Sequence, residues 1–183
     1  QPQFVVVHFQ LFHFIPLGML RADDAGRIAG PKAARLGELK HHYPEAVADG
    51  LVIPFGAFRA FLEQPMPGTG MSAYAWLRSE YRRINGLPAP QWGIEARGLQ
   101  ERLRNWIGAA DPGAEFRAAL GRAMQERFGP DGSYAVFVRS DTNMEDLPGF
   151  TGAGLNLTVP NVAGLDRVVA AIWWMRAAWK SST

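Results

Sequence analysis

The sequence of 183 residues contains no cysteine. This absence excludes disulfide scaffolds, thiolate metal sites, redox cysteine pairs and a cysteine nucleophile, but it says little about the compartment. Long apolar runs are absent too, because stretches such as residues 14–20 are far shorter than the roughly 20 residues of a membrane span. The first residues lack the basic start and the small-residue cleavage site of a signal peptide. We therefore expect a soluble, cytoplasmic protein with no membrane partner.

A large excess of charge of one sign is also missing. The chain has 19 basic and 17 acidic residues, for a net charge of +2, and 48% of its residues are hydrophobic. This composition is typical of one ordinary globular domain spanning residues 1–183. The densest basic stretch alternates with glutamates, as on a solvated helix face, so nucleic-acid binding is not expected. The residues of this stretch are Arg78, Glu80, Arg82, Arg83, Glu95, Arg97, Glu101, Arg102 and Arg104.

Apolar periodicity predicts a mixture of strands and helices. Strands are expected at residues 4–15, 134–138 (a compact, buried strand) and 155–159, with a short extended segment at 51–56. Helices are expected from Pro31, with Ala33, Leu36 and Leu39 at helical spacing, and at residues 57–63. A further helix is expected from about Leu165, with Val168, Val169, Ile172 and Met175 facing inward. Pro31 suits a first helical turn. Two amphipathic stripes predict further helices with core-facing side chains. They consist of Leu99, Leu103, Trp106 and Ile107, and of Phe116, Leu120, Met124 and Phe128.

Several kinds of catalytic site find no support in the sequence. His41 and His42 are adjacent and would diverge by about 100° on a helix, and His8 and His13 have no Asp or Glu at ligand spacing, so no metal site is predicted. Ser140 follows an arginine and precedes an aspartate, which is not the glycine-flanked turn of a serine nucleophile. The acidic pair Glu145 and Asp146 favours a loop-fixing role at least as much as acid–base catalysis. Catalytic residues therefore remain unassigned.

Two basic residues stand where an anion could bind, although no Walker A motif is present. Lys32 follows Gly30-Pro31 at the start of a predicted helix, where free N–H groups and the helix dipole favour an anion. Arg139 follows a predicted strand, and its planar fork of donors suits bidentate contact with phosphate. Surface salt bridges are the alternative explanation for each residue taken alone.

Three segments together resemble the N-terminal ATP-binding region of the phosphoenolpyruvate synthase and pyruvate phosphate dikinase family. They are GPKAARLGEL at residues 30–39, LVIPFGAF at 51–58 and VRSDTNMEDLPGFTGAGLNL at 138–157. The third segment is long and specific, and part of it is also similar to glucan water dikinases. The motif-bearing region, residues 30–159, covers most of the chain.

The resemblance implies an α/β (α+β) fold, the first lobe of an ATP-grasp-like domain with a mixed sheet and flanking helices. It implies a magnesium-dependent kinase-type transferase that passes a phosphoryl group from ATP to a histidine on another domain, and then to an acceptor. By the same resemblance Lys32 and Arg139 contact the ATP phosphates, and Gly152, Ala153 and Gly154 cover them.

The sequence also departs from the family pattern. Pro31 replaces the second glycine of the usual Gly-Gly-Lys, and no role is transferred to Arg176. The resemblance places the magnesium ligands and adenine contacts on a second lobe, and the acceptor histidine on a further domain. We therefore expect an incomplete domain, inactive alone, whose partners are ATP and those two units. The competing hypothesis is a stand-alone, non-catalytic or degenerate nucleotide-binding or interaction module, which the tryptophans at 173, 174 and 179 would suit.

Overall fold

The computed structural model describes residues 12–142 and 157–177. Both helices and strands are present in these ranges, so the expected mixed α/β fold is confirmed. The α-helices are α1 (Pro31–His42), α2 (Phe55–Phe61), α3 (Ala73–Asn85), α4 (Ala89–Ala109), α5 (Ala114–Phe128) and α6 (Leu165–Ala177). The strands are β1 (Ile15–Pro16), β2 (Leu51–Val52), β3 (Pro65–Met66), β4 (Met71–Ser72), β5 (Ala135–Arg139) and β6 (Thr158–Ala163), and short 3-10 helices are η1 (Leu17–Met19) and η2 (Ala22–Asp24).

The strands pair as antiparallel couples, β1 with β2, β3 with β4 and β5 with β6. The pair β5–β6 is the longest, and its register shifts by one residue between Val136 and Val138. Opposite this shift, Asn161 of β6 has a φ of 54°, a left-handed conformation that asparagine tolerates and that is common at β-bulges. Most of the strand expected at residues 4–15 lies outside the described residues.

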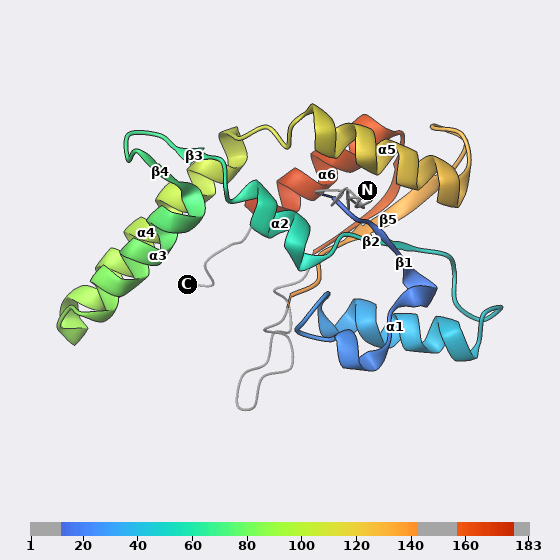
Figure 1. Cartoon of the computed structure of the whole chain (residues 1–183), viewed down its shortest axis with the longest axis horizontal. Coiled ribbons are helices and arrows are strands. Elements are labelled where there is room, and N and C mark those ends of the chain that lie inside the picture. Colours follow the sequence, from blue (N-terminus) through green and yellow to red (C-terminus); the bar gives the residue numbers. More distant parts are fainter. Residues whose placement is uncertain (1–11, 143–156, 178–183) are drawn as a thin grey trace, which may run out of the picture.

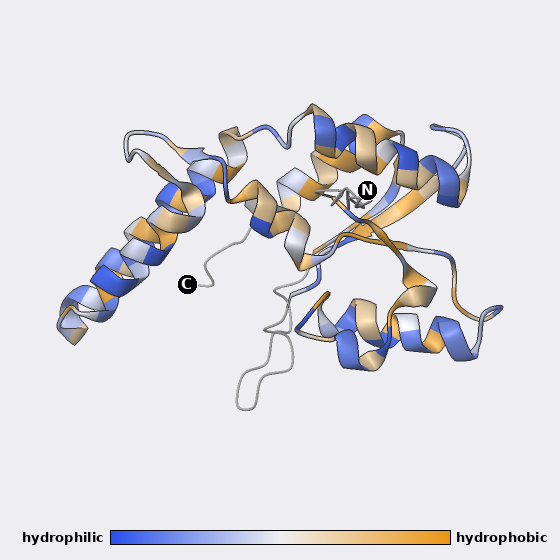
Figure 2. Ribbon diagram, in the orientation of Figure 1, coloured by the Kyte–Doolittle hydropathy of each residue, from blue (hydrophilic) through white to orange (hydrophobic). Residues whose placement is uncertain are grey.

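The main core lies between α5, α6 and one face of the β5–β6 pair (Figure 1). Three residues of the predicted stripe on α5 are buried and Phe128 is partly buried, and Val168, Val169 and Ile172 of α6 are buried as well. A second cluster joins α2 to α4 and includes Phe61 and Trp106. The helical stripes predicted from the sequence are thus confirmed, and hydrophobic and hydrophilic residues alternate along the helices (Figure 2).

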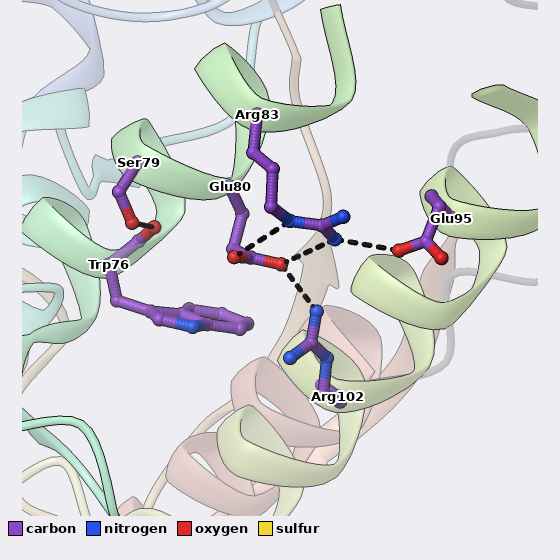
Figure 3. Close-up of polar contacts among 6 residues, drawn as sticks. All are labelled: Trp76, Ser79, Glu80, Arg83, Glu95 and Arg102. Carbon is purple, nitrogen blue, oxygen red and sulfur yellow. Dashed lines mark hydrogen bonds and ion pairs between the residues drawn. The ribbon is translucent and has the colours of Figure 1, made fainter. Parts of the chain in front are cut away.

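Helices α3 and α4 pack against each other and extend away from α1 and the β5–β6 pair (Figure 1). We call this helix pair, residues 73–109, the arm. Glu80 lies between two arginines, accepting hydrogen bonds from Arg83 at 3.0 Å and from Arg102 at 2.5 Å (Figure 3). Arg83 also binds Glu95 at 2.7 Å. The interleaved charges of the sequence therefore form a network of ion pairs on these helices.

The predicted burial needs two corrections. Strand β5 alternates between exposed and partly buried residues, and Phe137 is 70% exposed, because helices cover one face of this two-stranded sheet. On α1, Leu36 and Leu39 are exposed although they follow helical spacing, whereas Ala34 and Gly37 are buried. Small residues form the buried face of α1 because η1 approaches the helix closely there, as the contacts of Gly37 show.

Candidate functional site

The start of α1 carries the first of the two predicted phosphate contacts. Gly30 is the residue preceding the helix and Pro31 is its first residue, as the sequence predicted, because proline has no N–H to leave unpaired there. The side chain of Lys32 is exposed. The helix packs closely against η1 at Gly37, where an added Cβ would lie 2.6 Å from the Leu17 carbonyl oxygen.

Contacts along α1 fix it further. The Glu38 carboxylate accepts a hydrogen bond from the Ala22 backbone N–H at 3.0 Å. That bond, followed by the contact with His42, holds the pKa of Glu38 below its ordinary value. At the end of the helix the Lys40 ammonium donates to the carbonyl oxygens of Pro44 and Val47, each at 2.6 Å. Together these bonds orient α1 relative to the segments on both sides of it.

The second motif segment meets the first through the backbone. The N–H of Phe55, at the start of α2, donates to the carbonyl oxygen of Ile28 at 2.9 Å. Ile28 lies two residues before Gly30, so this bond sets the segment at residues 51–58 beside the turn that leads into α1.

Arg139 is the last residue of β5, and its side chain is exposed. Its partner on β6 is Thr158. The pairing extends one residue further, because Ser140 N–H donates to the Leu157 carbonyl oxygen at 3.0 Å and Leu157 N–H donates to Ser140 Oγ at 2.8 Å. Ser140 therefore helps to fix the strand end that carries Arg139.

Asp141 joins the first and third motifs directly. Its Oδ2 accepts a hydrogen bond from the Ala33 N–H at 2.9 Å, and its Oδ1 accepts one from the Lys32 N–H at 3.3 Å. The backbones that carry Lys32 and Arg139 are thereby brought together although the bond spans 109 positions of sequence. The expectation of free N–H groups at the helix start was wrong, because this carboxylate already accepts from two of them.

Sequence reasoning missed the role of Asp141. The available signal was its residue type, since aspartate is among the preferred helix-capping residues. That preference is normally applied to the residue just before a helix, which here is Gly30. The predicted phosphate-covering residues Gly152, Ala153 and Gly154 lie outside the described residues, as do Glu145 and Asp146.

Within the described ranges, no three His, Asp or Glu side chains are placed to hold a metal ion. A helix that crosses a membrane needs both length and an apolar composition. No helix among the described residues combines the two.

Comparison with known proteins agrees with the arrangement of these motifs. A family model described as the pyruvate phosphate dikinase AMP/ATP-binding domain matches residues 26–182. The chain belongs to this family. The match includes Lys32, Arg139 and Asp141, and it confirms the resemblance noted in the sequence.

Individual relatives point to the same family. A phosphoenolpyruvate synthase of Deinococcus radiodurans is 32% identical over 158 residues, which is 84% of this chain and 18% of the relative. A phosphoenolpyruvate synthase of Pseudomonas aeruginosa is 27% identical over 162 residues, or 87% of this chain and 19% of the relative. A rifampicin phosphotransferase of a Streptomyces species is 33% identical over 153 residues, which is 82% of this chain and 16% of the relative. The chain thus spans less than a fifth of the length of each of these family members.

Proposed function

We propose that this chain is the first lobe of an ATP-grasp nucleotide-binding domain in a dikinase-type phosphotransferase, with Lys32 and Arg139 binding the ATP phosphates. The observation that carries the proposal is the pair of hydrogen bonds from the start of α1 to Asp141. These bonds hold the lysine-bearing helix beside the strand end that bears Arg139. Both basic side chains are exposed, so a ligand can reach them.

The chemistry of the two side chains suits this role. A lysine ammonium acts as a point charge, whereas an arginine guanidinium offers a planar fork that matches two phosphate oxygens. Phosphoryl transfer depends mainly on positioning and on neutralising charge. The Lys32 and Arg139 side chains, one on a helix and one at a strand end, would supply the positioning and the charge neutralisation. No covalent step on this chain is needed.

The remainder of the reaction is proposed from the family. The phosphoryl group would pass from ATP to a histidine on another domain, and Gly152, Ala153 and Gly154 would cover the phosphates. Magnesium would accompany ATP, but the described residues do not form a metal site, so no step is assigned to a metal ion held by them. The final acceptor, which differs between the named relatives, is left unassigned.

Binding of ATP to the intact protein, measured by titration and by thermal unfolding, tests the proposal. At 100 times the dissociation constant, ATP should stabilise the protein by about 2.7 kcal/mol. Arg139→Ala should weaken binding by roughly ten- to a hundredfold, because hydrogen bonds to charged groups contribute about 1.5–3 kcal/mol. Lys32→Ala should weaken binding in the same direction.

Arg97→Ala is the matched control, because Arg97 is also exposed but lies on α4 in the arm. Its ATP affinity should equal that of the wild type. Wild-type affinity in both Lys32→Ala and Arg139→Ala would contradict the assignment of the phosphate contacts. Absence of any ATP binding would instead favour a non-catalytic interaction module, for which the exposed Phe137 and Trp174 are the supporting observation.

A further inference from the structure

We propose that Asp141 is a positioning residue of the phosphate site, which holds the helix carrying Lys32 in register with the strand end carrying Arg139. The inference rests on the proposed function and deepens it. Asp141 does not act on the nucleotide itself in this proposal. It acts through the backbone of α1, by keeping the two basic residues at a fixed relative position.

The hydrogen bonds at the start of α1 support this role. The first N–H groups of a helix have no partner within the helix and need an acceptor from elsewhere. Pro31 has no N–H, and those of Lys32 and Ala33 donate to Asp141. The next N–H, of Ala34, donates to the Gly30 carbonyl oxygen at 3.1 Å. The backbone N–H groups of the first turn therefore have acceptors, and two of these acceptors are oxygens of one carboxylate that is remote in the sequence.

Gly30 lies directly against the same carboxylate. A Cβ added at this position would overlap the Asp141 carboxylate, with Oδ2 only 2.7 Å away, and the three nearest atoms all belong to Asp141. The φ of Gly30 is −74°, which any residue can adopt. A side chain at residue 30 would therefore meet the Asp141 carboxylate, which would have to move away from its present position.

The contact also bears on how phosphate would bind. A helix N-terminus attracts anions, but at α1 the anion present is the protein's own carboxylate. A phosphate group would have to displace Asp141 to reach the N–H groups of Lys32 and Ala33. The geometry points instead to phosphate contact through the two basic side chains, with Asp141 remaining in place.

A double-mutant cycle on the intact protein tests the proposal. Asp141→Ala and Gly30→Ala should each weaken ATP binding by on the order of tenfold, because either change separates the helix from the strand end. The double variant should bind like Asp141→Ala alone, since the added Cβ at residue 30 then has no carboxylate to meet. Asp141→Asn, which keeps an acceptor oxygen, should bind between the wild type and Asp141→Ala.

Asp131→Ala separates positioning from stability. Asp131 also accepts a hydrogen bond from the start of a helix, because its Oδ1 lies 2.9 Å from the Leu165 N–H of α6. Both alanine variants should lower the unfolding temperature by about 2–4 °C. Only Asp141→Ala should weaken ATP binding.

The outcomes separate the inference from the function on which it rests. Unchanged or tighter ATP binding in Asp141→Ala overturns the positioning role, and so does equal weakening by Asp131→Ala. Additive losses in the double variant overturn the direct contact between residues 30 and 141. If the wild type itself binds no ATP, the proposed function fails, and the positioning role fails with it.

Discussion

The region formed by α1 and β5 and the arm formed by α3 and α4 both rely on charged side chains, but over different distances in the sequence. In the arm, Arg83 binds Glu80 three residues away, and Arg102 binds the same glutamate 22 residues away. In the α1–β5 region, Asp141 binds backbone groups 108 and 109 residues away. The candidate site is therefore held by a contact that forms only when the whole domain folds, whereas the charge network of the arm joins residues at most 22 positions apart.

This difference predicts different responses to substitution. Changes in the α1–β5 region should alter stability and ATP binding together, because the same contacts serve both. Changes in the arm should alter stability alone.

Trp173→Ala should have the largest effect, because this residue joins the two core clusters. Its ring centroid lies 5.1 Å from that of Phe61 and 5.8 Å from that of Phe116, and its Nε1 donates to the Ala110 carbonyl oxygen at 2.8 Å. Removing a large aromatic side chain from a core costs about 3–5 kcal/mol. Urea unfolding should show a loss of this size, and amide hydrogen exchange should rise in both α4 and α5.

Trp173→Phe is the corresponding control. It keeps most of the apolar contact but removes the hydrogen bond to Ala110, so its loss should be closer to 1 kcal/mol. Faster exchange in only one of the two helices would show that Trp173 does not connect the clusters.

Gly37→Ala tests the α1–β5 region. An added Cβ would lie 2.6 Å from the Leu17 carbonyl oxygen and 2.7 Å from Leu20 Cβ, so α1 would have to shift. Overpacking of this kind costs about 1–3 kcal/mol. The shift should also move Lys32 and weaken ATP binding. Destabilisation without any change in ATP affinity would show that the position of α1 does not govern the site.

The sequence predicted those parts of the fold whose contacts follow a local period. The stripes on α4 and α5, the inward face of α6 and the proline start of α1 are confirmed. Burial was predicted less well where tertiary packing decides it. Helical spacing favoured Leu36 and Leu39, but close approach of η1 left room only for Ala34 and Gly37. Nothing local to Phe137 indicates that one face of its strand is open.

The candidate site shows the same division. The segments that carry Lys32 and Arg139 could be identified because residue type and motif order are properties of the sequence. Their connection through Asp141 could not, since a hydrogen bond across 109 positions leaves no periodic signal. Gly30 could be read as part of a glycine turn, but its need for space beside a carboxylate is visible only in three dimensions.

Glu80→Gln tests the arm. Hydrogen bonds from Arg83, followed by those from Arg102, hold the pKa of Glu80 below its ordinary value. Its side chain is 15% exposed, and losing the charge should cost about 1 kcal/mol at neutral pH and low salt. Because the folded pKa is lowered, this stabilisation is complete above the unfolded pKa of about 4.3 and disappears as the pH falls through the folded value.

Unfolding curves for the wild type and Glu80→Gln should therefore differ at pH 7 and converge at acidic pH or in high salt. The affinity for ATP should not change. Weaker ATP binding in this variant would contradict the separation between the arm and the candidate site.

Gly98→Ala should have the smallest effect, and one of opposite sign. Gly98 lies within α4, and an added Cβ would meet no described atom within 4 Å. Alanine at such a position stabilises a helix by about 0.5–1 kcal/mol relative to glycine. Gly37→Ala makes the same chemical change inside α1, but there it is expected to lower the stability. The difference between the two stability changes therefore measures the close approach of η1 separately from helix propensity. The change in unfolding temperature measures the effect of Gly98→Ala directly. A loss of stability would mean that another surface packs against the arm at that point.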